Sequence, residues 1–371
     1  MDGRRLIVAS VVALLGATAI AAVPNPAPSP PSAAASGASE VTSAATSAAA
    51  AGDIPSEPAR LASRSLMLDV AAAGSRLIAV GERGQILLSD DEGSTWSQTP
   101  TPTQSLLTGV CFSDAQHGIA VGHDEIALAT SDAGATWKRT HYAPQAQQPL
   151  LDVWCGVGGH AIAVGAYGVY LVSADGGVTW DERKMDALPA AAPKAADDDA
   201  GGGFHLNAIA ADSRSRLYVA AEAGHLYRSD DGGAKWVSLH SPYEGSFFGV
   251  LPLGADTVLA FGLRGNLFRS ENAGATWERI NTGTVAMLDG GTTIGADGVV
   301  IVGLSGTLLV SHDDGKTFTV IQQPDRKGLA AVLAPAKARV LVTVGEAGAN
   351  LVRIPPAPAA ATTRNAAVAR R

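Results

Sequence analysis

The sequence has few charged residues, few aromatic residues and almost no cysteine. Of its 371 residues, 17% are charged and 5% aromatic, and two are cysteine. Two cysteines cannot build a tetrahedral zinc site or a disulfide scaffold. A net charge of −8 without a basic stripe argues against nucleic-acid binding. The eight histidines show no metal-ligand spacing, so we expect neither a metal nor another cofactor.

The N-terminus has the features of an export signal. Arg4 and Arg5 precede an apolar run over residues 6–23 that ends in small residues. This pattern predicts a signal peptide over residues 1–22, with an uncleaved membrane anchor as the alternative. We therefore expect the mature chain in the periplasm or an equivalent extracytoplasmic space.

Two segments have a composition typical of disorder. Residues 23–55 and 355–371 are rich in Ala, Pro, Ser and Thr, and they hold too little apolar surface to offset the entropy of ordering. We expect a disordered linker over 23–55 and a disordered tail over 355–371. The folded domain then covers residues 56–354.

Within that domain, a segment of the form Ser-x-Asp-x-Gly-x-Thr-Trp occurs six times. The closing aromatic residues are 41, 43, 56, 41 and 41 residues apart. The polar residue, the glycine and the aromatic residue of the six copies are Asp91, Gly93 and Trp96; Asp132, Gly134 and Trp137; Asp175, Gly177 and Trp180; Asp231, Gly233 and Trp236; Asn272, Gly274 and Trp277; and Asp313, Gly315 and Phe318.

Each copy follows three apolar, strand-like runs separated by turns. The pattern of one unit therefore predicts a four-stranded antiparallel meander of about 42 residues. Tandem units of this length are typical of a β-propeller. A seventh unit, over residues 329–354, contains only three strands. We predict an all-β, seven-bladed propeller whose ring is closed by an N-terminal strand, with residues 58–63 as the missing outer strand.

The repeated segment suits a hairpin between the third and fourth strands of a blade. Its Asp accepts backbone hydrogen bonds, its Gly takes a positive φ, and its aromatic ring covers the turn. This is the Asp-box, which we interpret as structural. A calcium loop is the alternative for Asp90-Asp91 and the similar pairs, but those loops lack further ligands.

The order of strand, Val-Gly-x-x-Gly turn, strand and Asp-box resembles the photosystem II stability/assembly factor family over residues 60–354. The resemblance also includes Leu68-Asp69-Val70 and Leu151-Asp152-Val153 at the starts of units. It implies an exported seven-bladed propeller that binds a membrane-protein partner in a chaperone-like way. Members of that family tend to carry an arginine patch on one face, to which Arg83 and Arg264 correspond here.

Turns between the second and third strands should share one face with the mouth of the central channel. Loops on a rigid scaffold are the usual place for binding. The candidate partner-binding residues are Glu82, Arg83, His123, Asp124, Tyr167 and Arg264 in the turns, and Asp69, Asp152 and Asn207 at the channel mouth; Glu222, Leu263, Ser305 and Glu346 belong to the same ring of turns. The long insertion over residues 185–203 should emerge on this face too.

A carbohydrate-active propeller of the sialidase or glycosidase kind is the alternative function. A sialidase needs three converging arginines, which the sequence does not place together, whereas a glycosidase needs two carboxylates, for which Asp69 and Asp152 are available. Because these two recur at equivalent positions, we interpret them as structural and expect no catalysis. We expect a monomer that binds a membrane or envelope protein.

Cys111 and Cys155 lie in neighbouring units. Facing sheets pack about 10 Å apart, whereas a disulfide needs Cα atoms within about 7 Å. We therefore expect two buried free thiols, and a disulfide near the axis remains the alternative.

Overall fold

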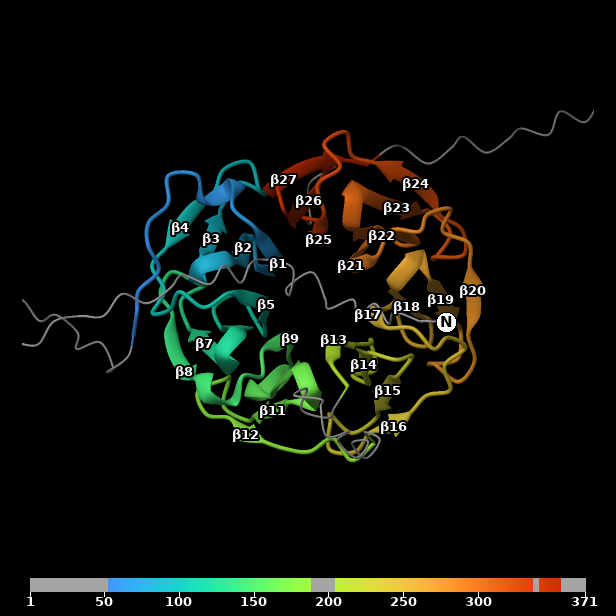
Figure 1. Cartoon of the computed structure of the whole chain (residues 1–371), viewed down its shortest axis with the longest axis horizontal. Coiled ribbons are helices and arrows are strands. Elements are labelled where there is room, and N and C mark those ends of the chain that lie inside the picture. Colours follow the sequence, from blue (N-terminus) through green and yellow to red (C-terminus); the bar gives the residue numbers. More distant parts are fainter. Residues whose placement is uncertain (1–52, 188–203, 336–339, 355–371) are drawn as a thin grey trace, which may run out of the picture. The chain divides into compact units, whose positions relative to one another are not determined.

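A computed structural model of the chain describes residues 53–187, 204–335 and 340–354. Figure 1 shows these residues as seven antiparallel sheets, or blades, around a central axis. Six blades have four strands in sequential order and the seventh has three. The prediction of a seven-bladed propeller is confirmed. The predicted signal, most of the linker, most of the 185–203 insertion and the tail lie outside the described residues.

Each blade starts with its innermost strand and ends with its outermost. Blades 1 to 3 consist of β1 (Met67–Ala73), β2 (Arg76–Gly81), β3 (Ile86–Ser89), β4 (Ser97–Thr99); β5 (Leu107–Phe112), β6 (Gly118–Gly122), β7 (Ile126–Thr130), β8 (Lys138–His141); and β9 (Leu150–Cys155), β10 (Ala161–Gly165), β11 (Tyr170–Ser173), β12 (Asp181–Glu182). Blades 4 to 7 consist of β13 (Leu206–Ala211), β14 (Leu217–Ala221), β15 (Leu226–Ser229), β16 (Val237–Ser238); β17 (Phe247–Pro252), β18 (Val258–Gly262), β19 (Leu267–Ser270), β20 (Glu278–Ile280); β21 (Leu288–Ile294), β22 (Gly298–Gly303), β23 (Thr307–Ser311), β24 (Thr319–Gln322); and β25 (Leu329–Leu333), β26 (Val340–Gly345), β27 (Gly348–Arg353).

Short 3₁₀ turns connect the strands. They are η2 (Ala62–Arg64), η3 (Glu82–Gly84), η4 (His123–Glu125), η5 (Pro144–Ala146), η6 (Val157–Gly159), η7 (Ala166–Gly168), η8 (Leu263–Gly265) and η9 (Leu304–Gly306). No helix among the described residues is long and apolar enough to cross a membrane.

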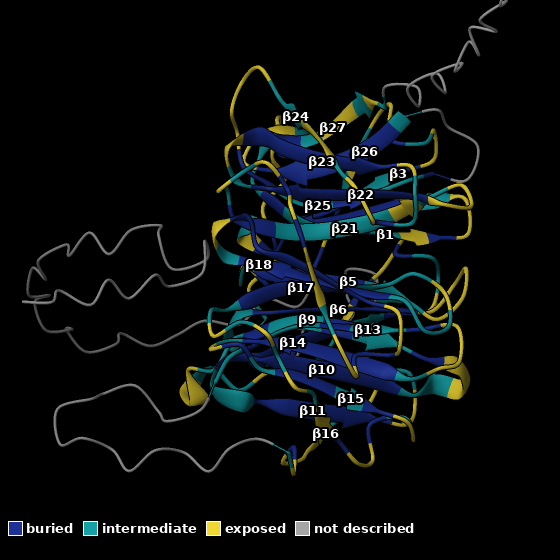
Figure 2. Ribbon diagram, turned by 90° about the vertical axis from the view of Figure 1, so that its right-hand side faces the viewer, coloured by how far each residue is buried: buried dark blue, intermediate teal, exposed yellow. Residues whose placement is uncertain are grey.

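The core lies between the blades. The second strands β6, β10, β14, β18 and β22 are buried along their whole length, because both of their faces pack against a neighbouring blade. Figure 2 shows this as dark blue strands inside an edge of exposed turns. Seven apolar clusters fill the spaces between successive blades, which explains the continuous apolar runs of the sequence.

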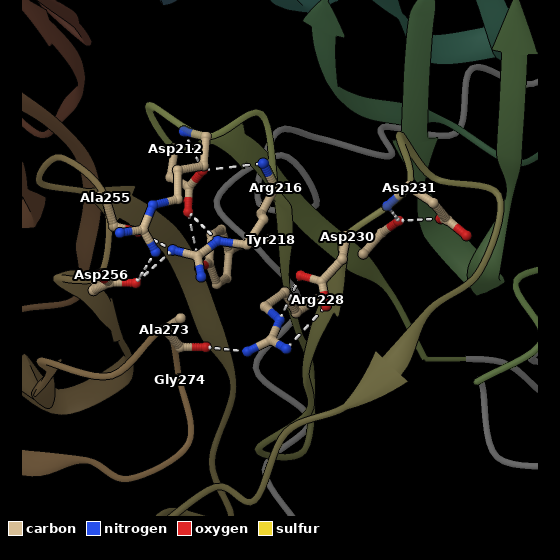
Figure 3. Close-up of polar contacts among 12 residues, drawn as sticks. Asp212, Arg216, Tyr218, Arg228, Asp230, Asp231, Ala255, Asp256, Ala273 and Gly274 are labelled. Atoms are coloured by element: carbon tan, nitrogen blue, oxygen red, sulfur yellow. Dashed lines mark hydrogen bonds and ion pairs between the residues drawn. The ribbon is translucent and has the colours of Figure 1, made fainter.

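Polar side chains also join the blades (Figure 3). Arg216, directly before β14, binds Asp212 of its own blade at 2.6 Å and Asp256 of blade 5 at 3.0 Å. Arg228 donates at 2.9 Å to the carbonyl of Ala273 in the Asp-box of blade 5. Arg76 and Arg269 reach the Asp-box of the following blade in the same way. An arginine thus fixes the hairpin of the next blade at three of the seven blade junctions.

The predicted pairing of residues 58–63 with the seventh blade is wrong for this structure. Blade 7 has three strands, and the N-terminal segment lies instead along β4 of blade 1. The backbone N–H of Ser56 donates to the carbonyl of Thr101 at 2.9 Å, and the side chain of Gln98 donates to the carbonyl of Glu57 at 2.9 Å. These polar partners place residues 56–59 on blade 1, and η2 at the end of the segment contacts β27.

The ring closes through side-chain packing. Met67 and Leu77 of blade 1 form one buried cluster with Val342 and Val344 of blade 7. The segment contacts blade 7 at its end, where Ala62 belongs to this cluster and a Cβ on Gly348 would collide with the carbonyl of Ser63. In the complete blades, Gly84 and Gly265 meet the connection after the fourth strand in the same way.

Cys111 and Cys155 form a disulfide, so the expectation of free thiols is wrong. Their Cα atoms are 5.6 Å apart. The two residues lie at the ends of β5 and β9, the innermost strands of blades 2 and 3. Because blades converge toward the axis, their inner strands approach more closely than the average sheet spacing that motivated the expectation.

Candidate functional site

In all six Asp-box hairpins the side-chain oxygen of the Asp or Asn accepts from the backbone N–H four residues later, and an indole bond to the glycine carbonyl occurs in blades 1 to 3. In blade 1, Asp91 accepts from the backbone N–H of Thr95 at 2.8 Å and from its hydroxyl at 2.6 Å. The indole of Trp96 donates to the carbonyl of Gly93 at 3.1 Å. The Thr95 hydroxyl and backbone hold the pKa of Asp91 below its ordinary value. The carboxylate is thus used within the turn, and the described residues contain no group that could hold a metal ion.

The candidate turn residues lie in matching 3₁₀ turns between the second and third strands. The middle residue of the turn has a positive φ, for example 55° at Arg83, 56° at Tyr167 and 57° at Arg264. Ala223 and Ser305 adopt the same conformation, with φ of 53° and 59°. The six complete blades therefore share this backbone geometry in the turn, and the side chain is left to vary.

The structure does not bring Arg83 and Arg264 together. Arg83 lies in η3 of blade 1 and Arg264 in η8 of blade 5, which are not neighbouring blades. Arg264 instead lines an open groove of about 720 Å³ with Arg279 and the loop over residues 281–285. In that loop Val285 is 85% exposed. This groove offers two cations beside an apolar side chain.

On blade 2, one of the turn residues lines a hollow that also includes Ile54 from the start of the described chain. Asp124 accepts from the hydroxyl of Ser105 at 2.6 Å, and both line a hollow of about 250 Å³ together with Ile54 and Tyr142. The Nε2 of His123 is buried without a hydrogen-bond partner among the described residues, and burial lowers the pKa of His123.

On blade 3, Tyr167 packs edge-on against His205, with ring centroids 4.9 Å apart. His205 in turn lies 3.5 Å from Glu222 of blade 4. Glu82 of blade 1 begins the η3 turn. The turn face therefore combines separate basic, aromatic and acidic positions around the ring.

Asp69 and Asp152 bridge adjacent blades at the channel. Asp69 accepts from its neighbour Val70 and from the backbone N–H of Val110 in blade 2, each at 2.8 Å. Asp152 accepts from Val153 at 2.7 Å and from Ile209 in blade 4 at 2.8 Å. Burial raises the pKa of Asp69 to about 6 and that of Asp152 to about 7. Both carboxylates are thus used in holding the inner strands together.

Every inner strand contains an irregularity near the channel mouth, where one residue is left out of the pairing. Asn207 is that residue in β13, whereas Asp69 and Asp152 come directly after it in their strands. Its Nδ2 donates to the carbonyl of Phe247 at 2.7 Å, while its Oδ1 is buried without a partner among the described residues.

Sequence reasoning missed Asp289, which occupies the irregular position of β21. Burial raises its pKa to about 7, and the charge of Asp69 adds to this effect. The dipeptide Leu288-Asp289 repeats the Leu-Asp pairs of blades 1 and 3, and it could have identified the residue.

Comparison with known proteins agrees with this architecture. The family model described as photosynthesis system II assembly factor YCF48 matches residues 143–297. Over those residues the chain is similar to that family, and its fold is a seven-bladed β-propeller. A comparison with curated proteins finds no match. The resemblance first indicated by the turns and Asp-boxes is therefore confirmed.

Solved structures are similar in fold. "YCF48 bound to D1 peptide" has a TM-score of 0.61 and 17% identity, over 79% of this chain and 94% of that one. "YCF48 from Cyanidioschyzon merolae" has a TM-score of 0.60 and 16% identity, over 78% and 95%. The WD40 propeller domain of Doa1 reaches the same TM-score at 12% identity, over 81% and 95%. At these identities the likeness concerns the fold alone.

Proposed function

We propose that this chain is an exported, non-catalytic propeller that binds a membrane or envelope protein and assists the assembly or stability of its complex. The family match over residues 143–297 carries the proposal. A similar structure is that of YCF48 bound to a D1 peptide, which gives a propeller of this architecture a polypeptide ligand. The partner of this chain is accordingly a protein segment.

The disulfide between Cys111 and Cys155 supports export. Disulfides persist in oxidising compartments and are rare in the cytosol of most organisms. The apolar run over residues 6–23, with two arginines before it, supports the same location. Secretion would deliver the chain to the compartment where envelope complexes are assembled.

The turn face is the proposed binding surface. In the six complete blades these turns are short and have a positive φ at the middle residue, so they present variable side chains on a rigid ring. The groove beside Arg264 and Arg279 suits an acidic segment with an apolar residue. Arg83 provides a further cation, on blade 1, at the same face.

Charge reversal tests this surface. The double variant Arg83→Glu, Arg264→Glu should reduce capture of the native partner from envelope extracts by at least about tenfold, because each change replaces attraction by repulsion. Crosslinking and mass spectrometry would measure capture. Lys235→Glu, on the exposed Asp-box of blade 4, is the matched control and should capture normally. Unchanged capture by a stably folded double variant would reject this face.

The non-catalytic part of the proposal rests on how the channel carboxylates are engaged. Both oxygens of Asp69 and both oxygens of Asp152 accept backbone hydrogen bonds, one of them from the next blade, which supports a structural role for each carboxylate.

We expect no turnover of sialosides or β-glucans by the purified full chain. The assay is product release at high enzyme concentration. Activity that disappears in Asp152→Asn while the fold persists would establish the carbohydrate-active alternative.

A further inference from the structure

Blade 7 leaves a strand edge unpaired. In the six complete blades a fourth strand covers the third, and third strands such as β11 and β23 are buried throughout. Among the described residues β27 pairs with β26 alone, η2 lies against its first residue, and it is the outermost strand of its blade (Figure 1). Asn350, Leu351 and Arg353 are exposed on it. An exposed edge of this kind is a template for another strand.

The register of the hairpin shows which backbone groups are available. Gly345 pairs with Gly348 across a two-residue turn, so these two exchange hydrogen bonds, and the bonded pairs alternate from there. The N–H and C=O groups of Ala349, Leu351 and Arg353 therefore point away from β26. They form a row of donors and acceptors along the outer edge of the blade.

No described segment of the chain pairs with this edge. Residues 53–61 are held on blades 1 and 2, where Ser56 bonds to Thr101 after β4 and Asp53 lies 2.6 Å from Arg139 on β8. The tail follows β27 directly, but Pro355, Pro356 and Pro358 stand where the complete blades have the Asp-box hairpin. In those blades the fourth strand always begins eight residues after the third ends. A proline-rich sequence does not encode that hairpin.

The side chains around the edge indicate what kind of strand fits. Leu351 is 43% exposed at the centre of β27. The exposed Arg353 lies at one end, and the exposed Arg64 lies beside Gly348 at the other. Neither arginine takes part in an ion pair within the described part of the chain. The edge therefore favours an extended segment with an apolar centre and acidic flanks.

We propose that the outer edge of β27 binds an extended acidic segment of a partner polypeptide, which becomes the fourth strand of blade 7. Main-chain hydrogen bonds would provide the affinity, and Leu351 with the two arginines would provide the selectivity. This site is separate from the turn face, and it does not depend on the partner proposed above. It adds a second interaction surface to the propeller.

The test uses a synthetic acetylated peptide that alternates threonine and valine, with an aspartate at each end. Added to the full chain, it should slow hydrogen exchange at the amides of Ala349, Leu351 and Arg353. The same peptide with lysine at each end should bind at least about tenfold more weakly, because the arginines then repel it. A peptide with proline at alternate positions should give no protection.

Variants of the edge separate backbone pairing from side-chain packing. Leu351→Pro removes an outward N–H without removing a bond to β26, and it should weaken the peptide by roughly tenfold or more. Leu351→Ala keeps that N–H and should bind better than the proline variant. Arg353→Glu should weaken the aspartate peptide and restore the lysine peptide. Lys235→Glu, in blade 4, is the charge control and should change neither.

Three results would overturn the proposal. The first is absence of protection on β27 at saturating peptide. The second is equal binding by stably folded Leu351→Pro. The third is an edge that is already protected in the full chain and is exposed only by deleting residues 355–371 or by dilution of a dimer, since the occupant would then be the tail or a second copy. Failure of the Arg83 and Arg264 variants would leave all three results unaffected.

Discussion

Three aspartates near the channel mouth differ in what their carboxylates contact. Asp69 and Asp152 each accept two backbone hydrogen bonds, one of them from the next blade. Asp289 accepts none among the described residues, and burial raises its pKa to about 7. A raised pKa means that the folded chain binds this proton more tightly than the unfolded chain does. The ionised form of Asp289 therefore has the least compensation of the three.

Asp289→Asn tests this difference. Wild-type stability should fall as the pH rises from the ordinary aspartate pKa of 3.8 toward about 7, because the unfolded chain releases the proton first. The variant should lose this part of the pH dependence and be more stable above pH 7, by on the order of 1 kcal/mol. Denaturant unfolding of the wild type and the variant, from pH 3.8 to above pH 7, measures the pH dependence and the difference in stability.

The exposed Asp297→Asn in the same blade is the control, and it should leave stability unchanged. Parallel stability curves for wild type and Asp289→Asn would contradict the assignment.

The strands and hairpins can be predicted from the sequence more accurately than the contacts between blades. The spacing of the Asp-boxes predicted the hairpin between the third and fourth strands in all six complete blades, because that motif satisfies its hydrogen bonds locally. The position of residues 58–63 could not be predicted in this way, since it depends on which blade offers polar partners such as Gln98 and Thr101. The register of Asp289 could not be predicted either: its Leu-Asp pair repeats in sequence, but Asp289 is the unpaired residue of its strand, whereas Asp69 and Asp152 are paired.

The contact between strand β11 and the next Asp-box is a case that can be measured. The hydroxyl of Tyr170 donates to the carbonyl of Gly233 at 2.8 Å and accepts from the indole of Trp236 at 3.3 Å. Tyr170→Phe leaves two buried polar groups without this partner and should lower the free energy of unfolding by about 1–2 kcal/mol. Chemical denaturation measures the loss.

Tyr227→Phe provides the matched control. Tyr227 is also fully buried, but its hydroxyl has no hydrogen-bond partner among the described residues. Removing that hydroxyl should leave stability unchanged or raise it, because an uncompensated polar group leaves the core. Equal destabilisation by both variants would show that packing, and not the bond to Gly233, sets the cost.

At the scale of the whole ring, closure depends on packing between the first and last blades. Met67 and Val342 belong to one buried cluster, although they lie near opposite ends of the folded sequence. No fourth strand reinforces this junction in the described residues. Blades 2 and 3, in contrast, are joined covalently by Cys111 and Cys155. The ring thus combines one non-covalent closure with one covalent junction.

The disulfide should therefore contribute to global stability without determining the fold. It closes a loop with a sequence separation of 44 residues, and loops of this order restrict the unfolded chain by about 2–4 kcal/mol. The variant Cys111→Ser, Cys155→Ser should unfold at lower denaturant concentration with unchanged circular dichroism. Reductant should shift the wild type to the same midpoint and leave the variant unmoved. The disulfide would be contradicted if both thiols of the wild type react with an alkylating agent after purification under oxidising conditions. The expectation of free thiols, based on the average sheet spacing, would then be correct.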